Sequence, residues 1–102
     1  GQGAHFYRNG NLKQGYVVGN AMILSMKFHE DVEWYESGKF KCGWLVGNNE
    51  YLGLKINSKI CLYENGSIKM ATFSEDVVID QRMYSRGLQY FFDEKFIKND
   101  AF

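Results

Sequence analysis

Tyr7-Arg-Asn-Gly-Asn-Leu-Lys13, Tyr35-Glu-Ser-Gly-Lys-Phe-Lys41 and Tyr63-Glu-Asn-Gly-Ser-Ile-Lys69 are the three stretches that decide the fold. Their tyrosines are evenly spaced along the chain, and all three stretches fit the pattern Y-x-[NS]-G-x-[LFI]-K. A fourth stretch, Phe92-Asp-Glu-Lys-Phe-Ile-Lys98, follows at nearly the same spacing and lacks the glycine. Self-similarity at a fixed period is the signature of an internal repeat.

The similarity extends beyond the motif. Val18-Gly19-Asn20 aligns with Val46-Gly47-Asn48, and Leu24 and Lys27 align with Leu52 and Lys55. A chain of 102 residues fits a single domain. We therefore expect one repeat domain over residues 1–102, with units at about 5–32, 33–60 and 61–89 and a partial unit at 90–102.

Each motif also predicts a hairpin. Asparagine and glycine tolerate the positive φ angles of a two-residue turn, so Asn9-Gly10, Ser37-Gly38 and Asn65-Gly66 are expected to be turns at equivalent places. Such turns would set four cross-strand pairs: Tyr7 with Leu12, Tyr35 with Phe40, Tyr63 with Ile68 and Phe92 with Ile97. Pairs of an aromatic with an aliphatic side chain stabilise a sheet. The motif residues Tyr7, Gly10, Lys13, Tyr35, Gly38, Lys41, Tyr63, Gly66 and Lys69 thus have a structural role.

The sequence around the turns alternates with period two and is rich in β-branched and aromatic residues, as in strands. We expect three strands per unit, for example 32–35, 39–46 and 51–56, with further turns at Gly19-Asn20, Gly47-Asn49 and Asn57-Ser58. Because every connection is short, neighbouring strands should pair antiparallel. The predicted fold class is all-β, an antiparallel meander of repeated three-stranded units curled into a roll or partial barrel. Leu88 to Phe92 should pair as a strand, and the segment after Glu94 should pair with it imperfectly or through a wider turn. The C-terminus should cover one open end of the roll or meet a second copy of the chain.

The motif Y-x-[NS]-G-x-[LFI]-K resembles that of bacterial antitoxin-like repeat proteins, which are related to MORN repeats. This resemblance, counted by units, covers most of the chain. It implies a β-meander that binds or interacts with other molecules, and it maps no catalytic site.

Composition narrows the function. The chain has twelve basic residues (lysine and arginine) and twelve acidic residues (aspartate and glutamate), so its formal net charge is zero. A chain without net charge does not attract the anionic backbone of nucleic acid over long distances, so nucleic acid is not the expected partner. The sequence contains no apolar run of the length that a membrane helix needs. The start Gly1-Gln2-Gly3 lacks an initiator methionine, which favours the hypothesis of a secreted or periplasmic protein whose signal peptide has been removed.

No catalytic, cofactor or metal site is predicted. The two histidines, His5 and His29, have no partner motif, and the two cysteines, Cys42 and Cys61, are too few for a structural zinc site. We expect both thiols to be free, because another strand should separate their strands. The acidic pairs Glu30-Asp31, Glu75-Asp76 and Asp93-Glu94 are expected in turns, which acidic residues favour in any case.

Two residue sets could carry binding. The recurring lysines of the motif could follow an acidic polymer, but a solubilising outer face explains them better. The aromatic residues Tyr16, Trp34 and Trp44 could stack on a sugar or a base, although most large aromatics of a small chain must be core. The leading hypothesis is a non-enzymatic protein that binds another macromolecule, a protein partner in the first place. The alternatives are a glycan- or cell-wall-binding module and a small hydrolase that uses turn carboxylates. Association with a second copy, through edge strands or the C-terminal segment, is a further expectation.

Overall fold

The computed structural model describes residues 4–10 and 12–96, except for the side chains of residues 16–18. These residues form ten β-strands and no helix, so the prediction of an all-β fold is confirmed. The strands are β1 (His5–Phe6), β2 (Leu12–Ile23), β3 (Met26–Trp34), β4 (Phe40–Leu45), β5 (Asn49–Tyr51), β6 (Leu54–Leu62), β7 (Ile68–Phe73), β8 (Val77–Ile79), β9 (Arg82–Tyr84) and β10 (Gln89–Phe91).

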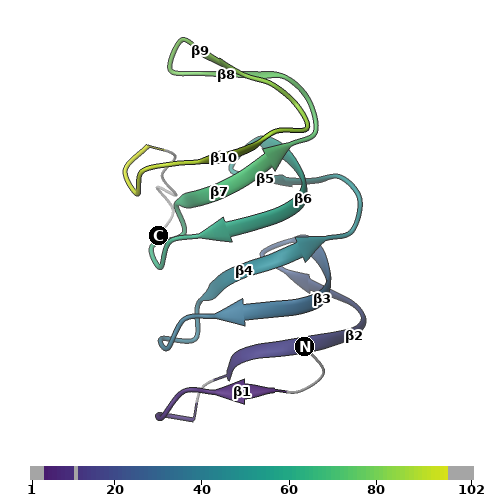
Figure 1. Ribbon diagram of the computed structural model, residues 1–102, viewed down its shortest axis with the longest axis vertical. Coiled ribbons are helices and arrows are strands. Elements are labelled where there is room, and N and C mark those ends of the chain that lie inside the picture. The colour runs from purple at the N-terminus through teal and green to yellow at the C-terminus, as the bar shows by residue number, and fades with distance from the viewer. Residues whose placement is uncertain (1–3, 11, 97–102) are drawn as a thin grey trace.

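One sheet runs through the whole molecule. Its order is β1-β2-β3-β4-β6-β7-β10, and all its neighbours are antiparallel, as a meander requires. β5 pairs only with β6, and β8 and β9 form a separate hairpin. The strands are stacked along the longest axis of the molecule, which measures 43 Å (Figure 1). The described strands do not close into a barrel.

The turns at Asn9-Gly10, Ser37-Gly38 and Asn65-Gly66 are confirmed, and they lie above one another along one edge of the sheet (Figure 1). Their register differs from the prediction by one residue. The glycine adopts a positive φ, +92° at Gly38, directly after a turn in which its N–H donates to the Tyr35 carbonyl. This is a type I turn followed by a glycine bulge, which holds one residue more than a two-residue turn.

The pairs across these turns are therefore not the expected ones. The residue before each tyrosine faces the apolar residue, as in Phe6 with Leu12, Trp34 with Phe40 and Leu62 with Ile68. The predicted pairs of Tyr7, Tyr35 and Tyr63 with these apolar residues were wrong. The predicted pair of Phe92 with Ile97 lies outside the described residues.

A second series of turns was not predicted. Leu24-Ser25, Leu52-Gly53 and Asp80-Gln81 recur with the spacing of the motif tyrosines, and in each turn both residues have positive φ. Such two-residue turns match the twist of the strands they join. The predicted strand 51–56 was wrong, because Leu52-Gly53 divides it into the end of β5 and the start of β6.

Some expected turns are bulges inside longer strands. Ser58 has positive φ, and the register of β6 shifts there, so Asn57-Ser58 does not end the strand. Glu30 also has positive φ, at the place in β3 where the register with β4 shifts. Gly19 has positive φ at the place in β2 where the register with β3 shifts. A bulge bends its strand. The far ends of β2 and β3, and β5 with the start of β6, consequently fold back behind the front strands in Figure 1.

The main core lies between these two arms of the bent strands. In β3, Met26 and Phe28 precede the bulge and Val32 follows it, and all three side chains are at most 2% exposed. β6 contributes Ile56 before its bulge and Ile60 after it. The bulges thus let one strand present apolar side chains to the core from two directions.

The last described strand closes this core. β10 pairs with β7, which confirms the expected strand within residues 88–92. Phe92 is 8% exposed, and its ring lies 6.1 Å from that of Phe73 and 5.4 Å from that of Tyr84. The chain then turns at Asp93 to Phe96, and the remaining C-terminal residues, on which the capping prediction depends, lie outside the description.

Candidate functional site

An apolar groove opens at the edge of the sheet where the glycine turns lie. Its volume is about 420 Å³, which falls within the range of small-ligand pockets. Three kinds of element form it: the tip of the β2–β3 hairpin, the β3–β4 turn with its flanking strands, and the β6–β7 turn. We call it the turn-edge groove, and its lining residues are Ile23, Leu24, Trp34, Gly38, Lys39, Phe40, Leu62, Tyr63, Glu64 and Gly66.

The walls of the groove are held by the hairpin pairing. Trp34 and Phe40 are directly paired across the β3–β4 turn, and their rings meet edge to face with centroids 6.0 Å apart. Phe40 is buried, whereas Trp34 is half-buried and packs against the core from the groove side. Leu24 is 42% exposed at the hairpin tip. The groove therefore combines a rigid aromatic wall with an apolar lip that meets solvent.

The three predicted ligand-binding aromatics do not form one row. Trp34 lines the turn-edge groove. Trp44 belongs to β4, is 42% exposed, and lines a different depression. Tyr16 lies in β2, and its side chain is outside the description.

The depression beside Trp44 is polar. Its volume is about 260 Å³, and Gln14, Asp31, Glu33, Cys42, Gly43, Trp44 and Lys59 line it. The Lys59 ammonium lies 5.2 Å from the centre of the Trp44 ring, within the range of a cation–π interaction. An exposed indole beside carboxylates and an amide is a suitable surface for a polar ring such as a sugar.

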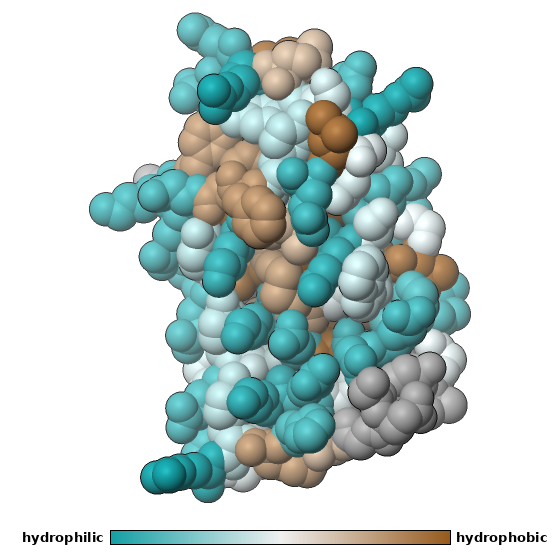
Figure 2. Space-filling view, in the orientation of Figure 1, coloured by the Kyte–Doolittle hydropathy of each residue, from teal (hydrophilic) through white to brown (hydrophobic). Residues whose placement is uncertain are grey.

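One row of paired residues crosses the sheet next to this depression. It runs through Phe91, Met70, Cys61, Cys42, Glu33, Gln14 and His5, each paired with the next. The row is apolar toward β10 and polar toward β1. Figure 2 shows the same trend, with hydrophobic surface over the part of the molecule near β7 and β10 and mainly hydrophilic surface toward β1.

The motif tyrosines connect successive turns. The hydroxyl of Tyr7 donates to the Trp34 carbonyl at 2.8 Å, that of Tyr35 to the Leu62 carbonyl at 2.7 Å, and that of Tyr63 to the Phe92 carbonyl at 2.7 Å. We call these three bonds the tyrosine ladder. Burial, followed by the nearby Glu64 carboxylate, raises the pKa of Tyr35 above its usual value.

The motif lysines belong to the same arrangement. The ammonium groups of Lys13, Lys41 and Lys69 lie 5.5–5.7 Å from the ring centres of the tyrosines that open their own motifs. The tyrosine, glycine and lysine of each motif thus form one local structure at the turn.

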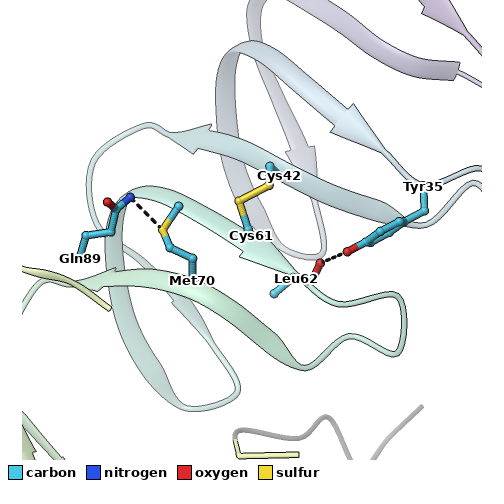
Figure 3. The surroundings of a disulfide bond; sticks show 6 residues. All are labelled: Tyr35, Cys42, Cys61, Leu62, Met70 and Gln89. Atoms are coloured by element: carbon cyan, nitrogen blue, oxygen red, sulfur yellow. Dashed lines mark hydrogen bonds between the residues drawn. A yellow bond between two sulfur atoms is a disulfide. The ribbon is translucent and has the colours of Figure 1, made fainter. Parts of the chain in front are cut away.

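Cys42 and Cys61 form a disulfide, so the prediction of free thiols was wrong (Figure 3). The prediction assumed that a strand separates them. The strand between them in sequence, β5, pairs only with the first part of β6, so β4 lies directly beside β6. The two cysteines are paired residues with Cα atoms 4.1 Å apart. Met70 lies in β7 and is paired with Cys61. It shares the small buried cluster of the two cysteines, and its sulfur accepts a hydrogen bond from the Gln89 amide.

The described residues contain no group of three or more His, Cys, Asp or Glu side chains that could hold a metal ion. His29 lies in β3, with Nδ1 3.6 Å from the Glu30 carboxylate. Of the acidic pairs, Glu75-Asp76 lies in a bend and Asp93-Glu94 at a turn, as expected, whereas Glu30-Asp31 lies within β3. Over the part of the chain that the structure describes, no helix has the length and apolar character to cross a membrane.

Sequence reasoning missed the groove and most of its lining. Leu24 entered only the alignment of the units, Phe40 only a strand and its predicted cross-strand pair, and Ile23 was not singled out. The available signal was a mismatch in the alignment of the first two units, where Ile23 stands opposite Tyr51.

Comparison of the chain with models of known protein families, with curated proteins and with solved structures finds no match.

Proposed function

We propose that this chain is a non-enzymatic β-repeat protein that binds a protein partner, and that the turn-edge groove is its binding site. The observation that carries the proposal is the apolar lining of an open groove of about 420 Å³. Grooves of this kind take up apolar anchor side chains, which supply most of the binding energy of an interface. The resemblance to antitoxin-like and MORN-related repeats favours the same class of function.

The charged groups at the groove add a requirement for the partner. Lys39 and Glu64 are the two charged lining residues, and both are exposed. A partner with polar groups around an apolar anchor would meet both charges at the rim, where they guide orientation more than they add affinity.

The experiment is selection of binders from a displayed random-peptide library, followed by affinity measurements on two matched variants. Leu24→Asn removes apolar lining from the groove, and asparagine accepts the positive φ of that turn, +53°. Leu52→Asn makes the same change at φ +52°, at a turn that does not line the groove.

We expect selected peptides to bind at least about tenfold more weakly to Leu24→Asn, which corresponds to about 1.4 kcal/mol. Binding to Leu52→Asn should be unchanged. If no peptide is enriched, or if the enriched peptides bind both variants equally, the groove is not the binding site.

Glycan binding is the second candidate, and the exposure of Trp44 beside polar groups favours it. A sugar ring stacked on the indole would meet Asp31, Glu33 and Gln14, which could hydrogen-bond its hydroxyls. A glycan array probed with the wild-type chain and with Trp44→Ala tests this. Binding that Trp44→Ala abolishes would support the glycan function, and an array without binding would remove it.

The third candidate is a hydrolase that uses carboxylates. Of the acidic residues expected in turns, Asp31 lines this depression beside Glu33, and both lie in β3 rather than in a turn. Turnover of a bound glycan that is lost in Glu33→Gln would replace the binding proposal by an enzymatic one.

The disulfide suits an oxidising compartment and so favours export of the protein. Fractionation of the native source would test this.

Self-association is tested separately. Phe91 in β10 is 73% exposed, and the neighbouring Leu88 is 55% exposed. Sedimentation of the wild-type chain and of Phe91→Ser would show whether a second copy binds at this end of the sheet.

A further inference from the structure

The turn-edge groove has an internal counterpart one unit further along the chain. Ile23 pairs with Met26 across the Leu24-Ser25 turn, and Tyr51 pairs with Leu54 across the Leu52-Gly53 turn. The two hairpin tips have the same geometry, since all four turn residues have positive φ. Ile23 and Tyr51 are therefore equivalent positions with side chains of different length.

The tyrosine at the second position fills its site. Tyr51 is 8% exposed, belongs to the main core cluster, and donates its hydroxyl to the Gly66 carbonyl at 2.7 Å. The residues under it are covered, since Gly66 is buried and Ser67 is 1% exposed.

The first position lacks that cover. Gly38 and Lys39, the counterparts of Gly66 and Ser67, are both exposed. They line the turn-edge groove together with Ile23. Isoleucine has neither the ring nor the hydroxyl with which Tyr51 reaches the next turn. The groove thus occupies the place that a tyrosine side chain fills in the following unit.

The wall chemistry agrees with this comparison. Trp34 and Phe40 offer an edge-to-face aromatic pair, against which a further ring packs favourably. The Gly38 carbonyl corresponds to the acceptor that Tyr51 uses, so a hydroxyl at the far end of the ring would find a hydrogen-bond acceptor. An apolar ring without a hydroxyl would bury the same area and leave this bond unmade.

We infer that the turn-edge groove binds the tyrosine side chain of a partner polypeptide, whose phenol hydroxyl donates to the Gly38 carbonyl as Tyr51 does to Gly66. This inference rests on the proposed function and specifies the anchor residue of the partner. It predicts a preference for tyrosine over phenylalanine of roughly 2- to 10-fold, the range for one neutral hydrogen bond.

The test uses N-acetyl-tyrosine amide and N-acetyl-phenylalanine amide as probes, titrated into the ¹⁵N-labelled full chain and followed by NMR. We expect the tyrosine probe to shift the amide signals of Leu24, Gly38 and Lys39, and to bind more tightly than the phenylalanine probe. Equal affinity of the two probes, or shifts confined to other residues, would overturn the inference.

One substitution fills the groove, and another at the equivalent turn outside the groove is its control. Ile23→Tyr supplies the side chain from within, so it should raise the melting temperature and reduce probe binding at least tenfold. Leu52→Asn changes a turn that does not line the groove and should bind the probe as the wild type does. Undiminished binding to a folded Ile23→Tyr chain would overturn the inference. If that variant does not fold, Leu24→Asn serves as the groove variant, and unchanged probe affinity there would overturn the inference equally.

The display experiment separates this inference from the proposed function. Selected peptides that lack tyrosine but lose affinity for Leu24→Asn would refute the tyrosine anchor and leave the protein-binding function standing. Peptides that carry tyrosine and lose affinity on its replacement by phenylalanine would support both.

Discussion

Gly43 offers a direct test of how tightly the core is packed, through the substitution Gly43→Ala. Gly43 lies in β4, paired with Val32 and Ile60. A Cβ atom added there would lie 2.7 Å from Cδ1 and 3.0 Å from Cε1 of Phe28, well inside van der Waals contact. Phe28 cannot move easily, because it is fully buried and its ring lies 4.8 Å from that of Phe40.

Two effects of opposite sign decide the outcome. In a strand, alanine is favoured over glycine by about 0.5–1 kcal/mol on backbone entropy alone. Forcing an extra methyl group into a close-packed core costs about 1–3 kcal/mol. The contact distances at Gly43 favour the second effect, so we expect a net loss of about 1–2 kcal/mol in the free energy of unfolding. For a domain of this size, that lowers the melting temperature by roughly 4–16 °C.

The equivalent position of the preceding unit, Gly15, provides the control. A Cβ at Gly15 would lie 3.4 Å from Cδ2 of Leu12, the end of a flexible side chain. Gly15→Ala should therefore leave stability unchanged or raise it slightly. Both variants would be compared with the wild type by urea unfolding followed by circular dichroism. A Gly43→Ala chain as stable as Gly15→Ala would refute the packing argument.

Three further predictions follow from the ladder, the disulfide and one buried hydroxyl. Tyr35→Phe removes the hydroxyl that donates to the Leu62 carbonyl, so it should lower the free energy of unfolding in urea by about 0.5–1.5 kcal/mol. A tyrosine whose hydroxyl bonds only to water would show no such loss when replaced by phenylalanine. Because the folded-state pKa of Tyr35 is raised above 10.0, its contribution is complete below that pH and is lost as the pH rises further; the variant should lack this alkaline loss. The Cys42–Cys61 disulfide joins residues 19 positions apart and so constrains the unfolded chain; its reduction should lower the free energy of unfolding by about 3 kcal/mol. An unchanged melting temperature in reductant would contradict this. Ser67 is 1% exposed, and its hydroxyl has no hydrogen-bond partner among the described residues, so Ser67→Ala should be neutral or stabilising; a clear loss on thermal melting would reveal a partner for it.

The glycine turns were predictable from sequence because only a few residue types accept their backbone geometry. Asn-Gly or Ser-Gly at fixed spacing identified the places of Gly10, Gly38 and Gly66 correctly. The turns at Leu24 and Leu52 were not predictable in this way, since leucine rarely adopts a positive φ. There the surrounding sheet imposes the conformation on residues that carry no turn signal.

The disulfide and the groove depend on which strands become neighbours. Cys42 and Cys61 meet because β5 pairs with only part of β6, and nothing local in the sequence shows how far such a pairing extends. Trp34 and Trp44 lie in paired, adjacent strands, yet they line different sites. The alternation of a strand predicts faces only as far as the next bulge, and the bulges of β3 shift that alternation.

The tyrosine ladder also bears on how long such a molecule can be. Within the segment 35–62, the hydroxyl of Tyr35 donates to the carbonyl of Leu62, so this ladder bond begins and ends inside the segment. A tandem duplicate of the segment would bring its own tyrosine, its own acceptor and its own pair of cysteines, and would leave no ladder group unpaired. Each added segment would contribute two strands to the sheet path and lengthen the molecule by about 10 Å, from the spacing of neighbouring strands. The architecture therefore sets the thickness and width of the molecule but no particular length.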